Sequence, residues 1–262
     1  MSSDKMISKV EDGIGWMIFN NPERHNAISL EMWEGALEIM ASFGADPEVR
    51  VMVVTGAGGK AFASGADISK FKDERQEAQS LARYQETTQK AYSAIQDMSV
   101  PTIAMVRGYC IGGGTAVAVC CDIRICTEGS KFGIPAAKLG LGYGLNRAQP
   151  LVDLVGPAFA KEMFFTGRQF DAREAEKMGL VNRVVADDVL ESTVEEMALT
   201  IASNAPLTVR CAKLVVGEVL KDVADRDIAA TERAVAACFA SSDYREGQAA
   251  FAEKRKPKFI GA

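Results

Sequence analysis

Three consecutive glycines, Gly112-Gly113-Gly114, constrain this chain more than any other stretch of its sequence. They follow an apolar segment at 101–106, predicted to be a buried strand, and they open a run of small apolar residues that ends near Cys121. Successive residues without a Cβ allow backbone N–H groups to come close to a ligand. Because the next segment is predicted to be a helix, these N–H groups would lie at its positive end and favour a developing negative charge. A glycine-rich turn of this kind can equally serve packing alone.

A second stretch of small residues, Ser64-Gly65-Ala66-Asp67, could supply another backbone donor. Two N–H groups that converge on one oxygen form an oxyanion hole, which stabilises a thioester carbonyl as it becomes an enolate. The two stretches could instead be unrelated structural turns. Taken alone, the residues therefore define a candidate pair of donors and leave its use open.

Apolar and helical patterns alternate over the first two thirds of the chain. Ser29 can cap a helix, and the continuous apolar run at 51–55 fits a strand that is buried on both faces. Beyond Gly156 the pattern is helical, with Asp171 and Glu174 forming a capping box. Strands are predicted at 14–19, 51–55, 101–106, 122–126 and 131–135, and helices at 73–97, 157–165, 188–203, 206–221, 225–241 and 243–254.

Strands that alternate with helices, followed by helices alone, predict an α/β fold with a helical appendage. We expect residues 1–200 to form the α/β core and residues 201–262 to form the helical C-terminal region. Helices of this kind often cannot bury their apolar faces by themselves. We therefore expect them to complete a neighbouring copy, which makes the protein an oligomer.

Composition narrows the classes of partner. The formal net charge of −5 argues against a nucleic-acid-binding protein. The six cysteines show no metal-ligand spacing, and most lie in apolar runs, as expected in a reducing compartment. Since the sequence has neither an apolar signal core at its start nor a run long enough to span a membrane, we expect a cytoplasmic protein with no membrane partner. The one histidine, His25, lies in a polar turn.

Motifs along nearly the whole chain resemble the enoyl-CoA hydratase/isomerase family, also called the crotonase superfamily. The resemblance implies a spiral of ββα units with a C-terminal helical trimerisation region, assembled as a homotrimer or a dimer of trimers. It also implies an acyl-CoA substrate and no metal or redox cofactor, since coenzyme A enters as part of the substrate thioester. The matching pieces are Pro22 with Asn26-Ala27, Val53-Val54-Thr55-Gly56, Ala61 to Ile68, Ile111 to Gly114, Cys121-Asp122-Ile123, Phe164 with Thr166-Gly167-Arg168, Ala175 with Gly179-Leu180-Val181, and Glu246-Gly247 with Phe251 and Glu253 to Pro257.

The resemblance also implies roles for individual residues. It assigns the oxyanion hole to the N–H groups of Ala66 and Gly113. Contacts with the acyl-CoA thioester and the adenine side fall to Ala66, Asp67 and Ile68. The remaining substrate contacts that it implies are Arg24, Asn26, Ala27, Lys258 and Phe259, of which the last two would come from a neighbouring helix.

The acid–base residues of a hydratase are missing from this sequence. Hydratases of the family carry two glutamates, at the positions that Ala116 and Ala136 occupy here. A general acid or base typically contributes about 10²–10⁴-fold to a rate. We therefore expect this chain not to be an ordinary crotonyl-CoA hydratase.

Tyr143, between two glycines, is the polar residue that remains near the expected pocket. Its loop is similar to that of methylmalonyl-CoA decarboxylase, a superfamily member that also has a tyrosine there and lacks the glutamate pair. Decarboxylation yields the enolate directly and needs no base, so Tyr143 could orient the carboxylate or supply a proton, while Arg147 holds the charge. That decarboxylase has histidine where this chain has Ala66. Two alternatives stay open: Tyr143 only lines the pocket, or the protein is a non-catalytic acyl-CoA-binding paralogue.

Overall fold

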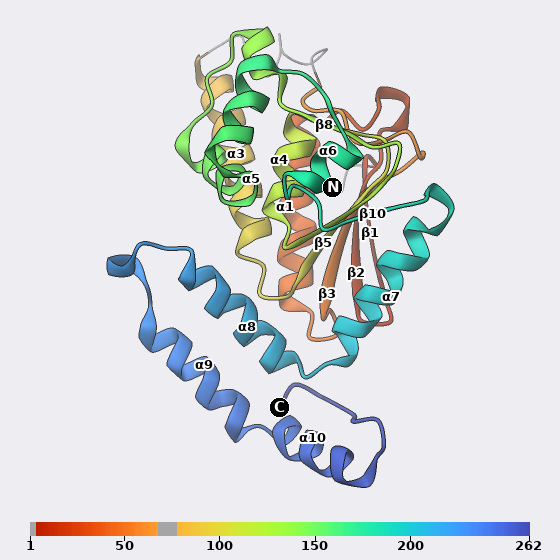
Figure 1. The fold of residues 1–262 in the computed structure, drawn as a ribbon, viewed down its shortest axis with the longest axis vertical. Coiled ribbons are helices and arrows are strands. Elements are labelled where there is room, and N and C mark those ends of the chain that lie inside the picture. Colours follow the sequence, from red (N-terminus) through yellow and green to blue (C-terminus); the bar gives the residue numbers. More distant parts are fainter. Residues whose placement is uncertain (1–3, 68–77) are drawn as a thin grey trace.

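The computed structural model describes residues 4–67 and 78–262, which form two sheets covered by helices (Figure 1). The larger sheet has the order β1-β2-β3-β5-β7-β10; its β1 and β2 are antiparallel and its other neighbours are parallel. The smaller sheet has the order β4-β6-β8-β9, of which only the β8–β9 pair is antiparallel. The strands are β1 (Met6–Glu11), β2 (Ile14–Phe19), β3 (Val51–Gly56), β4 (Ala61–Ala63), β5 (Thr102–Val106), β6 (Tyr109–Ile111), β7 (Ile123–Thr127), β8 (Lys131–Gly133), β9 (Phe170–Asp171) and β10 (Arg183–Val185).

Consecutive pairs of strands divide between the two sheets and are followed by a helix. The first unit is β3, β4 and α3 (Ala78–Gln96), the second is β5, β6 and α4 (Gly113–Cys120), and the third is β7, β8 and α5 (Leu145–Thr166). In each unit the first strand joins the larger sheet and the second joins the smaller one. This repetition confirms the spiral of ββα units that the resemblance implies.

The central strand β3 is buried on both faces, as its continuous apolar run predicts. Val51 and Val53 pack toward α7 (Leu190–Ser203), whereas Met52 and Val54 join the main core on the other face. Helix α1 (Leu30–Ala45) covers that second face together with α3, and Ser29 caps it through the N–H of Met32. The alternation places the helices that carry the candidate site on one face of the larger sheet.

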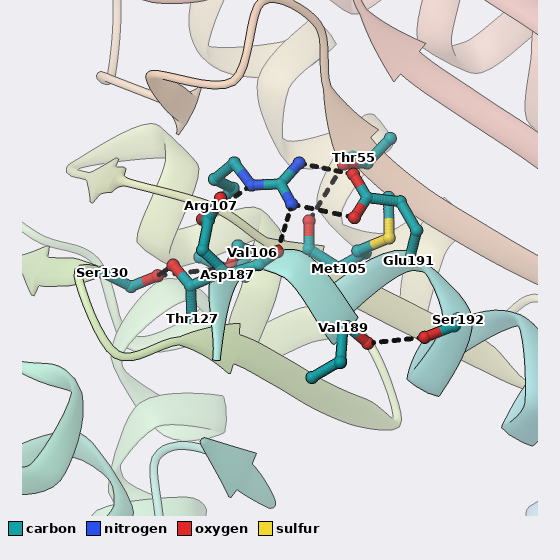
Figure 2. A network of polar contacts seen from close by, with 10 residues as sticks. All are labelled: Thr55, Met105, Val106, Arg107, Thr127, Ser130, Asp187, Val189, Glu191 and Ser192. Atoms are coloured by element: carbon teal, nitrogen blue, oxygen red, sulfur yellow. Dashed lines mark hydrogen bonds and ion pairs between the residues drawn. The ribbon is translucent and has the colours of Figure 1, made fainter. Parts of the chain in front are cut away.

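A charged network fixes the chain just before it enters the glycine-rich turn. Arg107 follows β5, and its guanidinium donates to Oδ1 of Asp187 at 2.9 Å and to Oε2 of Glu191 at 2.8 Å, at the start of α7 (Figure 2). These hydrogen bonds from Arg107 lower the pKa of Glu191. Nearby, Thr55 and Ser130 donate to the carbonyls of Met105 and Val106. The carboxyl end of β5 is thereby tied to its neighbours on several sides.

Helix α5 begins earlier than the sequence predicts. It starts at Leu145, and Gly156, with φ of +71°, interrupts it before Pro157. The non-helical backbone of Gly156 divides α5 into two helical parts, and the helix predicted from Pro157 is confirmed as the second part. The first part, from Leu145, was not predicted, since Gly144 provides no side-chain cap. The strands β1, β4, β6, β9 and β10 were not predicted. The first part of the helix predicted at 73–97 lies outside the described residues. The predicted capping box of Asp171 and Glu174 is confirmed at the start of α6 (Ala172–Lys177).

The last helices, α8 (Pro206–Val219), α9 (Ile228–Ala240) and α10 (Ser242–Glu253), extend away from the sheets (Figure 1). Lys213 of α8 reaches back to Asp122, with a distance of 2.8 Å between Nζ and Oδ2. Many large apolar side chains on this region are exposed, among them Val219, Leu220, Val223, Ile228, Phe239 and Phe251. A helical C-terminal region is therefore present, while the boundary at residue 200 stays a prediction. Within the described residues, no helix is both long enough and apolar enough to cross a membrane.

Candidate active site

Two glycine turns lie against each other at the edge of the smaller sheet. A Cβ atom on Gly65 would lie 3.7 Å from the backbone nitrogen of Gly113 and 3.2 Å from the carbonyl oxygen of Ile111. A Cβ on Gly112 would in turn lie 3.7 Å from Cα of Gly65. The backbones of the two predicted donor stretches are thus in van der Waals contact. The structure brings together segments that are almost fifty residues apart in the chain.

The N–H groups of Ala66 and Gly113 are both available at this contact. Ala66 forms a parallel bridge with Ile28, which uses the Gly65 carbonyl and the Asp67 N–H and leaves the Ala66 N–H aside. Gly113 is the first residue of α4, where helical N–H groups lack an intrahelical acceptor. Neither N–H has an acceptor within residues 4–67 and 78–262. Two N–H groups in this position can stabilise a negatively charged oxygen, and the dipole of α4 increases that stabilisation.

Glycine is required at this contact by geometry. Gly65 and Gly112 have φ values of +104° and +56°, which side chains rarely allow. A Cβ on Gly114 would lie 2.1 Å from the carbonyl oxygen of Ala63. The glycine run therefore allows α4 to start directly against β4, which positions the Gly113 N–H.

The residues predicted to contact coenzyme A surround the first turn. Arg24 pairs with the buried Asp67, with 3.4 Å between Nη1 and Oδ1. Asn26 is fully buried: its side-chain amide donates to the carbonyls of Ala57 at 2.9 Å and Ala61 at 2.7 Å, and its oxygen accepts the N–H of Asn21. Any substrate contact of Asn26 must therefore use its backbone.

The remaining predicted substrate contacts divide into two groups. Ala27 is buried beside Asn26, and Ile68 lies outside the described residues. Lys258 and Phe259 follow α10, at the opposite end of Figure 1 from α3 and α4. The Lys258 N–H donates to Glu246, and the Phe259 carbonyl accepts from Arg50. Within one chain, these two residues lie apart from the glycine turns.

Ala116 and Ala136 belong to the main apolar core, and the partly buried Tyr143 packs against it. Ala116 is 4% exposed and Ala136 is 8% exposed. The ring of Tyr143 packs on Phe164 with 4.9 Å between centroids, and burial raises the pKa of its hydroxyl to about 12. The nearby Thr115 hydroxyl donates to the carbonyls of Cys110 and Gly133. We therefore interpret Thr115 as a structural residue.

Three aromatic residues of α1 and α3 complete the surroundings of Gly113. A Cβ on Gly113 would lie 3.6 Å from the hydroxyl oxygen of Tyr92 and 3.7 Å from the Trp33 ring. The Trp33 and Tyr92 rings meet edge to face with 5.1 Å between centroids, and the Trp33 indole donates to the Tyr84 hydroxyl at 3.4 Å. Burial, reinforced by Tyr143 and Tyr84, raises the pKa of Tyr92 well above its ordinary value. Sequence reasoning missed these residues because an aromatic stripe at helical spacing is typical of a core.

The family is decided by comparison with known proteins. Residues 9–262 match the family model described as enoyl-CoA hydratase/isomerase. The chain belongs to the enoyl-CoA hydratase/isomerase family. It is 35% identical over 260 residues to a crotonyl-CoA hydratase from Syntrophomonas wolfei, with 99% of each chain covered. It is 33% identical to a short-chain-enoyl-CoA hydratase from Clostridium acetobutylicum, with 98% of this chain and 97% of that protein covered.

Solved structures from the family agree with this fold. A crystal structure of an enoyl-CoA hydratase/carnithine racemase from Magnetospirillum magneticum superposes with a TM-score of 0.94 and 36% identity, covering 100% of this chain and 97% of the other. The similarity extends over the helical C-terminal region as well as the spiral core. The fold and the acyl-CoA-processing family of this enzyme are therefore established.

Proposed function

We propose that this enzyme binds acyl-CoA thioesters and stabilises their enolates with the N–H groups of Ala66 and Gly113, without a pair of glutamates. The contact between the two glycine turns carries the proposal, because each turn has an N–H group without an acceptor among the described residues. Donors of this kind typically contribute about 10²–10³-fold each to acyl-transfer rates. Backbone groups keep this capacity whatever side chains surround them.

Hydration is the competing reaction, because similar proteins carry the name of crotonyl-CoA hydratase. Hydration needs a group that activates water and another that protonates the substrate. Ala116 and Ala136, at the positions expected for those groups, bear only methyl groups. We therefore place the enzyme among those whose chemical step does not depend on a carboxylate base.

Decarboxylation of the methylmalonyl-CoA type is the second candidate, with Tyr143 as the catalytic residue. Loss of carbon dioxide leaves its bonding electrons on the α-carbon, so the enolate forms directly. Because burial raises the pKa of Tyr143 to about 12, the phenol keeps its proton at neutral pH and acts as a hydrogen-bond donor. This property suits a group that orients a carboxylate or protonates the enolate afterwards.

We also infer that Lys258 and Phe259 reach the coenzyme A bound by a neighbouring subunit, in a homotrimer or a dimer of trimers. The exposed apolar faces of α8 to α10 support this assembly, as do the positions of both residues away from the glycine turns. Phe251, which is 88% exposed, is the clearest candidate for burial between copies. Light scattering that gave a monomer would contradict the assembly.

We place this protein in the cytoplasm.

A mass-spectrometric screen tests the proposed function. The purified enzyme is incubated with malonyl-, methylmalonyl-, enoyl- and branched acyl-CoAs, and products are scored for loss of carbon dioxide or gain of water. Turnover that falls sharply in Tyr143→Phe supports a catalytic tyrosine, and unchanged turnover of every accepted substrate removes that role. Binding of thioesters with no turnover of any would identify a non-catalytic paralogue.

A further inference from the structure

Arg147 stands out among the charged residues around the acyl side of the site. It lies in the first turn of α5 and is half-buried, and its Nη2 donates to the hydroxyl of Thr88 on α3 at 2.9 Å. Its guanidinium lies over the Tyr92 ring, 5.6 Å from the centroid. Within the described residues it forms no ion pair with a carboxylate. Among the described residues, the titratable groups that face this part of the site are the phenols of Tyr92, Tyr143 and Tyr84 and the thiol of Cys120.

Tyr92 links this guanidinium to the oxyanion hole. Its side chain is 6% exposed and its hydroxyl lies beside Gly113, held between the edge contact with Trp33 and the guanidinium on its face. The hydroxyl has no hydrogen-bond partner in the part of the chain that the structure describes. It can therefore donate a hydrogen bond to a ligand group that lies beside Gly113.

The two features together favour an anion. A half-buried guanidinium with a neutral partner on one side keeps most of its five donors for a planar acceptor such as a carboxylate. A glutamate at position 116 or 136 would supply a negative charge from the protein, but both positions are alanine. This part of the site therefore combines the charge of Arg147 with the phenol of Tyr92, and neither position 116 nor position 136 adds a carboxylate.

We propose that Arg147 and Tyr92 form a subsite for a carboxylate on the acyl group, beside the oxyanion hole, so that the preferred ligands are coenzyme A thioesters of short dicarboxylic acids. Arg147 binds the carboxylate, Tyr92 donates an additional hydrogen bond to it, and Thr88 positions the guanidinium. The acyl chain must be short because the Tyr92 hydroxyl is adjacent to Gly113. This inference rests on the proposed function, since it requires the thioester to lie at the Ala66 and Gly113 amides.

Calorimetric titration with matched thioesters tests the subsite. Malonyl-CoA is compared with propionyl-CoA, and succinyl-CoA with butyryl-CoA, because each pair differs by a terminal carboxylate in place of a methyl group. Mass spectrometry of the same samples confirms that the thioesters are intact. Since hydrogen bonds to charged groups contribute about 1.5–3 kcal/mol, the better dicarboxylic ligand is expected to bind about 10- to 150-fold more tightly than its neutral partner.

Variants separate recognition from folding. Arg147→Gln is expected to reduce the ratio of the two affinities to about one, and Tyr92→Phe to reduce it by about 3- to 10-fold. Arg147→Lys, which keeps the charge but not the planar fork, should restore part of the ratio. Arg83→Gln is the matched control, because Arg83 is an exposed arginine of α3 paired with Glu34, and it should leave the ratio unchanged.

Three results would overturn the subsite. Equal affinities within both pairs for the wild-type enzyme would show that no carboxylate is recognised, while the proposed acyl-CoA function would stand. An Arg147→Gln variant that is folded by circular dichroism and keeps the full ratio would remove Arg147 from the subsite. Failure of the wild-type enzyme to bind any of the four thioesters would contradict the proposed function itself, and the subsite with it.

Discussion

The oxyanion half of the proposed site is made of backbone, whereas the acyl half is made of side chains. The first half consists of N–H groups at two glycine turns whose φ values and close contacts exclude other residues. The second half is contributed by Trp33, Tyr92, Tyr143 and Arg147, from helices α1, α3 and α5 and the loop before α5. A backbone N–H group donates whatever side chain its residue carries. An enzyme can therefore keep its oxyanion hole while the side chains around the acyl group change. Ala116 and Ala136, at positions where the resemblance implies glutamates, are consistent with such an exchange.

The largest effect on stability is expected from adding a methyl group at Gly114. In Gly114→Ala the new Cβ would lie 2.1 Å from the Ala63 carbonyl oxygen, so α4 and β4 must separate at a cost of about 3 kcal/mol or more. In Gly113→Ala the nearest atom would be 3.6 Å away, which is an ordinary contact. Thermal denaturation should therefore show a severely destabilised Gly114→Ala and a stable Gly113→Ala. Equal stability of the two variants would contradict the account of the turn.

Removal of one backbone donor should leave the fold intact and reduce turnover. Replacing Ala66 by lactic acid, through an ester in place of the amide, deletes the N–H and keeps the methyl group. Turnover of the substrate identified by the screen is expected to fall about 10²–10³-fold. The same replacement at Ala82, an exposed position on α3, is the control and should leave turnover unchanged. A full rate in the Ala66 ester would exclude this N–H from the oxyanion hole.

The buried Asn26 should matter for stability more than for chemistry. Asn26→Ala leaves the carbonyls of Ala57 and Ala61 and the N–H of Asn21 without their partner, which should lower the free energy of unfolding by about 1–3 kcal/mol. Asn20→Ala removes an exposed hydrogen bond to Asp4 and should change it much less. Urea denaturation measures the free energy of unfolding of both variants. Equal losses in the two variants would show that the hydrogen bonds of Asn26 do not stabilise the fold.

The smallest effect is a pH dependence of the acyl half. Since burial raises the pKa of Tyr143 to about 12, the folded enzyme holds this proton where the unfolded chain, with a pKa of about 10, has lost it. This tyrosine therefore contributes stability below about pH 10 that is lost as the pH rises toward 12. The ultraviolet difference between wild type and Tyr143→Phe should show phenolate formation near pH 12 in folded enzyme. A midpoint near pH 10, as in denaturant, would mean that the ring is not buried.

The backbone half of the site could be predicted from the sequence and the side-chain half only in part. Glycine encodes its conformation locally, so the two turns were recognisable from the residues, whereas their pairing through Ala66 and Gly113 came from the family resemblance. Tyr92 and Trp33 lie on apolar helical stripes that are indistinguishable from core, and only tertiary packing brings them to Gly113. The long helices and half of the strands were predicted from sequence patterns, yet the first part of α5 was missed because Gly144 caps it without a side chain. Short strands such as β6 pair with segments that lie far away in the sequence, and their few residues show no alternating pattern that would predict a strand.

Crotonyl-CoA offers the most direct test of the claim that the backbone half is retained while the acid–base half is exchanged. Its binding is measured by calorimetry, and its hydration by loss of the ultraviolet absorbance of the conjugated thioester. The account predicts that the wild-type enzyme binds crotonyl-CoA but hydrates it at least about 10⁴-fold more slowly than a hydratase with both glutamates, assayed in parallel. Hydration at the rate of that hydratase would contradict the account, because Ala116 and Ala136 would then have cost the enzyme nothing.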